Sequence, residues 1–208
     1  MLNPMYLSEI LYDLVSVYKN EEKIFKFLHI PVQSGSNNIL KHMYRGHDIK
    51  IFKKAIDEFR KSIPEITIAT DVIVGFPNET EEDFKLTMDL IRDSEPDIIN
   101  ISKYSQRSGT VSSKLKNISS DQKKLRSSFL HSLSREISKR RNNLWIGWIG
   151  DVYIDEITNK VVQGRNYAYK SVIINNAHAL KLKVGQIIKV KVVDSSQYSL
   201  FAESLDFK

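Results

Sequence analysis

The sequence has no cysteine, and this absence excludes several kinds of chemistry. None of its 208 residues can form a disulfide or supply a thiolate, so a zinc finger, a thiol nucleophile or a cysteine-held cluster cannot be built from them alone. The sequence also lacks any run of about 18 apolar residues and the charged-then-apolar order of a signal peptide. We therefore expect no membrane contact and a cytoplasmic location.

Patterns typical of metal ligands and nucleophiles are lacking too. The five histidines do not have the spacing of metal ligands, and neither a Walker-type loop nor a Ser/His/Asp order is found. We therefore predict no metal site and no catalytic side chain in this chain. What the sequence does have is an excess of positive charge, with 31 basic and 25 acidic residues and a net charge of +6. This excess favours an anionic partner such as nucleic acid.

Short apolar runs alternate with amphipathic segments over the first two thirds of the chain. This alternation predicts an α/β fold in which helices connect parallel strands. The run 66–74 is apolar on both sides of the chain, which predicts a strand in a sheet covered on both faces. The predicted strands are residues 25–32, 66–74 and 97–105. The predicted helices are residues 5–19, 38–43, 49–62 and 81–93.

Capping residues mark the beginnings of these helices. Ser36 or Asn37 can cap the helix 38–43, and Asp48 can cap the helix 49–62. Thr80 and Asp83 have the spacing of a capping box, with aspartate in place of the usual glutamate or glutamine.

A basic helix and a change of pattern mark the boundary between two predicted domains. Residues 119–143 predict a long amphipathic helix with seven basic and two acidic side chains, and either a solvated outer face or a surface for an anionic partner would explain its charge. After Asn143, five short alternating runs separated by Gly, Asn and Ser predict a small antiparallel barrel. We place the domains at residues 1–143 and 144–208.

Polar residues follow each predicted strand of the first domain. The segments are 33–35, 75–79 and 104–110, and ligands bind beyond the carboxyl ends of strands in parallel sheets. Asp71 lies inside an apolar strand, where a buried carboxylate needs a partner. It is therefore either a structural hydrogen-bond anchor or a ligand contact.

The predicted barrel carries basic and aromatic residues close together. Arg165 and Lys170 are interleaved with Tyr167 and Tyr169, a combination suited to phosphate contacts and base stacking in looped RNA. Lys189 and Lys191 alternate along one run and so share a face. A solvated hairpin is the alternative interpretation.

Four motifs, together with the terminal barrel, resemble the radical-SAM tRNA methylthiotransferases. The nearest branch is the archaeal and eukaryotic one that acts on N6-threonylcarbamoyladenosine at position 37 of tRNA. The matching motifs are FLHIPVQSGS at 27–36, MYRG at 43–46, IATDVIVGFPNET at 68–80 and NISKYSQRSGT at 100–110. Three residues depart from the family pattern: Gln106 and Ser108 stand where prolines are usual, and Asn78 stands where a glycine is usual.

The resemblance implies a partial radical-SAM TIM-like barrel followed by a TRAM domain, an OB-like RNA-binding barrel. It implies S-adenosylmethionine and two 4Fe-4S clusters in the full-length family, and addition of a methylthio group to C2 of the modified adenosine. The expected partner is the tRNA anticodon arm. The implied cofactor-binding residues are Gln33, Ser34, Gly35, Asp71, Gly75 and Pro77. The implied substrate-binding residues are Arg107, Arg165, Tyr167, Tyr169, Lys170, Lys189 and Lys191.

The cluster-binding domain and cysteine triplet of the family are not among these 208 residues, and cluster ligation requires them. We therefore expect the C-terminal portion of such an enzyme, either as a split or truncated reading frame or as one half that needs the missing half as a partner chain. The alternative is a non-catalytic RNA-binding protein that keeps the TRAM domain. A stand-alone α/β enzyme with other chemistry is a weaker third interpretation.

Overall fold

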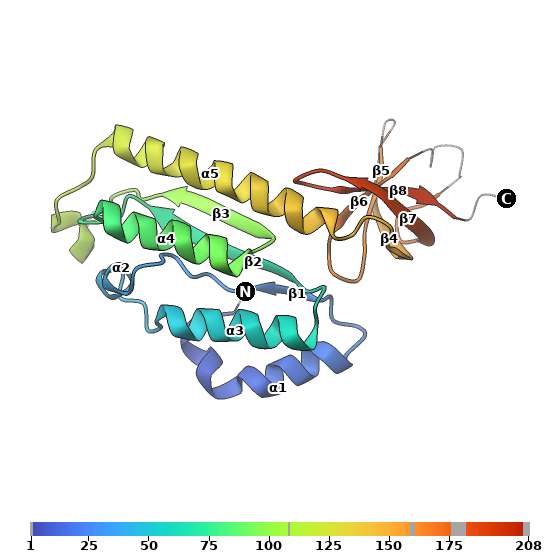
Figure 1. The fold of residues 1–208 in the computed structure, drawn as a ribbon, viewed down its shortest axis with the longest axis horizontal. Helices are drawn as coiled ribbons and strands as arrows, with labels where there is room; N and C mark the ends of the chain where they lie inside the picture. Colours follow the sequence, from blue (N-terminus) through green and yellow to red (C-terminus); the bar gives the residue numbers. More distant parts are fainter. Residues whose placement is uncertain (1, 108, 159–160, 176–181, 206–208) are drawn as a thin grey trace.

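The chain folds into a three-stranded parallel sheet with helices and a closed five-stranded barrel (Figure 1). The computed structural model describes residues 2–107, 109–158, 161–175 and 182–205. In these ranges, no helix is both long and apolar enough to span a membrane. The α/β class and the terminal barrel predicted from the sequence are confirmed.

The predicted helices of the first unit form with the expected caps. Ser36 accepts a hydrogen bond from the backbone N–H of Ile39, Asp48 caps the next helix, and Thr80 forms a reciprocal capping box with Asp83. The helical elements are η1 (Pro4–Tyr6), α1 (Leu7–Asn20), α2 (Asn37–His42), α3 (Ile49–Ser62), α4 (Glu81–Ser94), η2 (Val111–Lys114) and α5 (Ser120–Asn143).

The sheet has the order β1-β2-β3, and both pairings are parallel. The strands are β1 (Phe27–His29), β2 (Thr67–Val74) and β3 (Ile98–Lys103). The first strand is shorter than the predicted 25–32 because the chain leaves the ladder at Pro31, which has no N–H to donate. It returns only for an isolated bridge between Gln33 and Val72.

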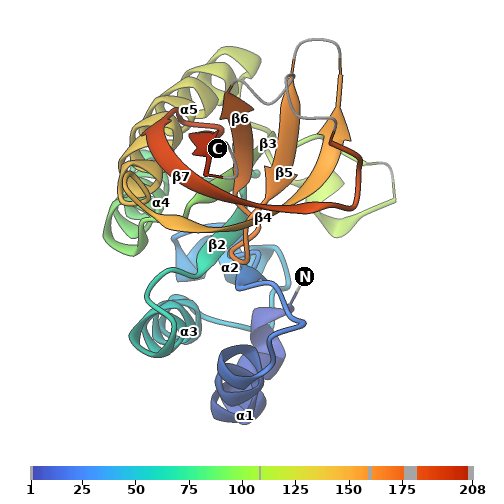
Figure 2. The same cartoon turned by 90° about the vertical axis from the view of Figure 1, so that its right-hand side faces the viewer.

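The described helices cover one face of the sheet. Figure 2 shows α3, α4 and α5 along the same side of the strands, and Val72, Val74 and Ile99 are buried there in the main core. On the other face, Asn100 and Ser102 of β3 are exposed. Thr67 and Ala69 of β2 lie on this same face and are buried. The prediction of a sheet covered on both faces is therefore confirmed for the first half of β2 and wrong for the uncovered part of the face, which the end of β2 and β3 form.

The barrel closes in the order β4-β5-β6-β8-β7. Alternate residues point inward and form a second core that includes Val152, Val190 and Ala202. The β6–β8 pairing is parallel, so the predicted antiparallel barrel contains one parallel contact. Its strands are β4 (Ile149–Ile157), β5 (Val162–Arg165), β6 (Ser171–Asn175), β7 (Ile187–Ser195) and β8 (Leu200–Ser204).

A buried ion-pair cluster around Asp97 joins the two units. The Asp97 side chain lies just before β3 and is about 1% exposed, and its Oδ1 is 2.8 Å from Lys170 Nζ of the barrel and 3.3 Å from Arg141 Nε of α5. Its Oδ2 accepts the backbone N–H of Ile68 and lies 3.7 Å from Arg60. Burial alone would raise the pKa of Asp97, but Lys170 and Arg141 outweigh it and hold the pKa below its ordinary value.

Candidate functional site

The candidate site is a cavity of about 680 Å³ at the carboxyl ends of β2 and β3. It lies where ligands gather in parallel α/β folds. Its walls come from β2, β3 and the loops around them. The lining residues are Gln33, Arg45, Asp71, Val72, Ile73, Asn100, Ser102, Lys103, Tyr104, Ser105, Arg107, Thr110 and Ser112.

Among the residues that the structure describes, Asp71 is the one carboxylate that lines this cavity. Its Oδ1 lies 2.8 Å from His29 Nε2 on β1 and accepts a 2.8 Å hydrogen bond from Asn100 Nδ2 on β3. The side chain therefore links all three strands on the uncovered face. Of the two interpretations open for Asp71, the structural hydrogen-bond anchor is confirmed. A ligand contact stays a prediction, which the position of Asp71 in the cavity wall allows.

Gln33 lines the cavity next to Asp71. Its backbone has φ 71°, in the left-handed region, where a non-glycine residue is held only by its surroundings. Its N–H donates to the Asp71 carbonyl, and its own carbonyl accepts from the Ile73 N–H. These bonds fix Gln33 against β2.

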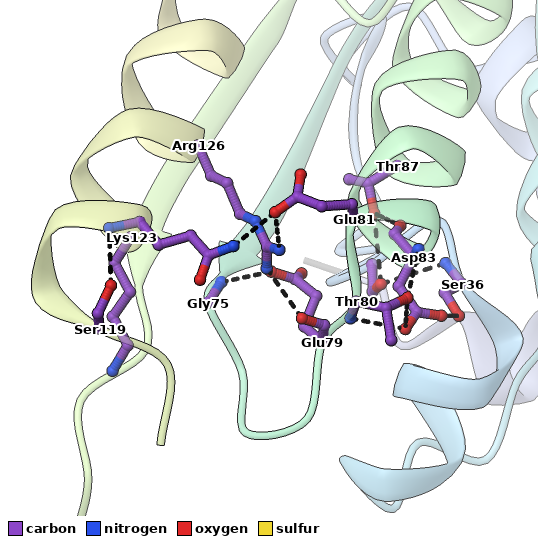
Figure 3. Close-up of polar contacts among 12 residues, drawn as sticks. Ser36, Gly75, Glu79, Thr80, Glu81, Asp83, Thr87, Ser119, Lys123 and Arg126 are labelled. Atoms are coloured by element: carbon purple, nitrogen blue, oxygen red, sulfur yellow. Dashed lines mark hydrogen bonds and ion pairs between the residues drawn. The ribbon is translucent and has the colours of Figure 1, made fainter. Parts of the chain in front are cut away.

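Ser34 and Gly35 are not among the residues that line the cavity, and their predicted contact with a cofactor stays a prediction. Both are buried against α4, where the hydroxyl of Thr87 accepts the Gly35 N–H at 2.9 Å and lies 3.4 Å from Ser34 Oγ. A Cβ on residue 35 would lie 2.4 Å from the Thr87 Cα, so only glycine permits this approach. Figure 3 shows the adjoining bond from Ser36 to Asp83, 2.5 Å long.

Gly75 and Pro77 are also buried and absent from the cavity lining. Gly75 has φ +74°, and its N–H donates to Glu79 Oε2 at 2.8 Å. Arg126 of α5 reaches the same carboxylate at 2.6 Å and also Glu81 at 2.6 Å (Figure 3). Burial raises the pKa of Glu79, and the Gly75 N–H and Arg126 oppose that rise. These bonds give the turn a structural role, and the predicted cofactor contacts of Gly75 and Pro77 stay predictions.

Three cationic side chains line the cavity, and the sequence identified only one of them. Arg107 was predicted as a substrate contact, and the structure places it in the same wall as Gln33 and Asp71. Arg45 and Lys103 were missed, although both belong to matched motifs, because neither shows a pattern that separates it from an ordinary surface base. The cavity thus joins polar, hydroxyl and cationic groups to one carboxylate.

Lys170 does not lie on the surface, which corrects its predicted contact with RNA. Its side chain is about 7% exposed, and its ammonium donates to Asp97 Oδ1 and to Asn142 Oδ1 at 2.9 Å. Tyr167 is likewise engaged: its hydroxyl donates to Glu65, and its ring packs on Trp145 and Trp148. These two residues connect the barrel to the first unit. Tyr167 is half-buried, so its RNA contact stays a prediction.

Arg165 and Tyr169 remain together on the barrel surface. The Arg165 guanidinium lies 5.0 Å from the Tyr169 ring centre, and Phe25 meets that ring edge-on at 5.1 Å. Arg165 Nε is also 2.9 Å from Asp155. Lys189 and Lys191 are exposed on β7, but Asp151 lies opposite Lys189 and Glu203 opposite Lys191. This face therefore has mixed charge.

The predicted basic helix uses much of its charge in tertiary contacts. Arg126 and Arg141 are paired with buried carboxylates, and Arg140 is paired with Glu95 and Glu136. Lys139 donates to the Ser195 carbonyl of β7. Neither a solvated outer face nor a surface for an anionic partner is therefore sufficient to explain the charge of α5. Several of its basic side chains attach the helix to α4 and to the barrel.

Comparison with known proteins identifies the family. Residues 3–91 match the model of the Radical SAM superfamily, so the first unit is of the radical-SAM class. Two relatives are named "Probable threonylcarbamoyladenosine tRNA methylthiotransferase". The Archaeoglobus fulgidus protein is 40% identical, and the match covers 93% of this chain and 44% of the relative. The Methanocaldococcus jannaschii protein is also 40% identical, and the match covers 93% of this chain and 43% of the relative. The chain belongs to the tRNA methylthiotransferase family.

Other matches are more distant. A "tRNA-2-methylthio-N(6)-dimethylallyladenosine synthase" from Caldicellulosiruptor saccharolyticus is 33% identical over 92% of this chain and 41% of its own length. Among solved structures, coproporphyrinogen III oxidase (HemN) from Escherichia coli aligns over 96% of this chain and 50% of its own, with 14% identity and a TM-score of 0.49. That likeness is too weak to add to the assignment. The chain spans less than half the length of these curated relatives.

The residues present do not fit an iron–sulfur cluster. The chain has no cysteine, and no group of three or more His, Asp or Glu side chains suited to a metal ion occurs in the described ranges. The cavity does fit a polar ligand, because Asp71 can accept from hydroxyl or ammonium groups and Gln33 can both donate and accept.

Proposed function

We propose that this chain is the C-terminal portion of a tRNA methylthiotransferase that adds a methylthio group to C2 of N6-threonylcarbamoyladenosine at position 37 of tRNA. The observation that carries the proposal is 40% identity to relatives of that name across both units. The cavity at the strand ends supports it, since it has the position and polar lining of a ligand site.

The two units would divide the work. In the first, Gln33 and Asp71 would hold S-adenosylmethionine, which with a cluster supplies the radical chemistry of the family. The barrel would act as a TRAM domain and hold the anticodon arm through Arg165, Tyr169, Lys189 and Lys191. No thiolate ligand is available in these 208 residues, so the cluster would need a cysteine-bearing segment outside them.

Complementation tests the catalytic part of the proposal. The chain alone, given S-adenosylmethionine and a reductant, is expected to yield no 5′-deoxyadenosine. Adding the cysteine-bearing remainder of the Archaeoglobus relative, reconstituted with iron and sulfide, is expected to restore 5′-deoxyadenosine and methylthiolated tRNA, both measured by mass spectrometry. Asp71→Asn should lower both products in the complemented sample, while exposed Asp93→Asn should not.

Two outcomes would count against catalysis by this chain. One is a complemented sample in which the chain is folded, as circular dichroism would show, and neither product forms. The other is equal product with and without the chain. If tRNA binding persists in either case, the non-catalytic RNA-binding alternative is favoured.

Salt-dependent binding tests the barrel surface. Arg165→Ala is expected to weaken tRNA binding and to reduce the slope of log K against log salt by about one, because each phosphate contact releases roughly one counterion. Filter binding over a salt series measures both quantities. The matched control is Lys50→Ala, an exposed cation on α3. Identical slopes for wild type and Arg165→Ala would remove Arg165 from the RNA contact.

A further inference from the structure

The cavity has an excess of positive charge that the structure leaves unpaired. Arg45, Lys103 and Arg107 line it together with one carboxylate, Asp71, which is already bonded to His29 and Asn100. None of the three cations has a carboxylate partner among the residues that the structure describes. By contrast, the basic residues of α5 that face the fold are paired. A cavity with this imbalance attracts an anion.

The three cations come from separate segments whose backbones are anchored. Arg45 follows α2, and its N–H donates to the Leu40 carbonyl at 2.9 Å. Lys103 ends β3 and pairs with Val74 of β2. The Arg107 carbonyl accepts from the Thr110 hydroxyl at 2.8 Å. The fold therefore brings three exposed cationic side chains to one cavity, where a single anion can contact more than one of them.

Hydroxyl groups lie in the same wall as these cations. Ser102, Ser105 and Ser112 line the cavity, and the Tyr104 hydroxyl donates to Ser112 Oγ at 2.9 Å. A threonylcarbamoyl group carries a carboxylate, a hydroxyl and amide N–H groups, so it suits such a lining. A dimethylallyl group has neither charge nor hydrogen-bonding capacity and would leave these polar groups without partners.

On this basis, and resting on the function proposed above, we propose that Arg45, Lys103 and Arg107 form a subsite that binds the carboxylate of the threonylcarbamoyl group. An arginine guanidinium matches a carboxylate with two parallel hydrogen bonds. Arg45, Lys103 and Arg107 are therefore specificity-determining residues, which select threonylcarbamoyladenosine over unmodified or dimethylallyl-modified adenosine.

The test compares three synthetic anticodon stem-loops that differ only at position 37: threonylcarbamoyladenosine, adenosine and dimethylallyladenosine. Fluorescence anisotropy with the full chain is expected to show about tenfold tighter binding of the threonylcarbamoyl loop, the range expected for one charge-assisted contact. The double variant Arg45→Ala/Arg107→Ala should bind all three loops equally. Arg107→Lys, which keeps the charge, should retain part of the preference.

The control variant is Arg92→Ala, which removes an arginine paired with Asp89 in the last turn of α4. That turn precedes β3 and so lies at the opposite end of the sheet from the cavity. The variant should keep the full preference. Circular dichroism melting curves would show whether all variants fold, as expected for exposed positions.

Three results separate the possible explanations. Equal affinity of the wild-type chain for all three loops would overturn the subsite. A cavity that binds RNA phosphate instead would make the double variant lose affinity for every loop by the same factor, which also overturns it. If no loop binds at all, the proposed function itself fails, and this outcome is distinct from loss of the modification preference.

Discussion

Asp97→Asn is expected to lower the free energy of unfolding by about 3–5 kcal/mol, because it leaves buried cations without their compensating charge. Lys170 would lose its only carboxylate partner among the described residues, and Arg141 and Arg60 would lose theirs close by. The amide is nearly the same size as the carboxylate, so lost packing would contribute little. Urea unfolding monitored by tryptophan fluorescence measures the change.

The control for this variant is Asp93→Asn. Asp93 is 62% exposed and pairs with Lys53 at 2.9 Å, and an exposed pair of this kind contributes less than about 1 kcal/mol. Similar losses for Asp93→Asn and Asp97→Asn would show that the Asp97 cluster adds no more than a surface contact.

The same cluster makes a pH-dependent contribution whose sign follows from the Asp97 pKa. Its folded-state pKa lies below the ordinary value of 3.8, so the unfolded chain takes up the proton first as pH falls. The contribution of the ionised Asp97 to the free energy of unfolding is complete above pH 3.8. It is lost as pH falls through the folded-state pKa of Asp97. The difference in stability between wild type and Asp97→Asn should therefore be constant near neutral pH and narrow below pH 3.8.

Arg126→Ala is expected to cost a similar amount, about 3–5 kcal/mol, since it leaves the Glu79 carboxylate buried and unpaired. The side chains of Arg126 and Glu79 are 2% and 1% exposed. Removal of both charges in Arg126→Met/Glu79→Gln should cost much less, because an amide oxygen at position 79 can still accept the Gly75 N–H. Urea unfolding of the three proteins measures the difference.

Arg140→Ala is the matched control, because Arg140 lies on the same helix and forms exposed pairs with Glu95 and Glu136. Its stability should stay close to that of the wild type. If the double variant Arg126→Met/Glu79→Gln is as unstable as Arg126→Ala, lost packing and not lost charge explains the decrease in the free energy of unfolding.

Local features of the sequence predicted much of the fold. The caps at Ser36, Asp48 and Thr80 depend on residues within a few positions along the chain, so their spacing is visible in the sequence. The alternating runs after Asn143 likewise predicted the barrel strands. The parallel pairing of β6 with β8 was not predictable, because it depends on how the barrel closes.

The site was harder to predict, because its contacts join residues distant in sequence. Lys170 looked like a surface base among aromatic residues, yet its partner Asp97 is 73 positions away. Asp71 was recognised as unusual because it interrupts an apolar strand. Arg45 gave no such signal, since only the fold brings it to the cavity that Lys103 and Arg107 line.

Helix α5 fixes a distance as well as a connection. An α-helix rises about 1.5 Å per residue, so the 24 residues of α5 extend about 36 Å. At its start, Lys123 lies against Gly75 and the Tyr104 ring, and near its end, Asn142 bonds to Ser196 beside β7. Because both ends are attached, the length of the helix sets the separation between the cavity and the barrel. A nucleic acid bound to the barrel would therefore reach the cavity at a fixed distance from its barrel contact. This distance, in addition to the chemistry of the cavity, would determine which nucleotide enters it.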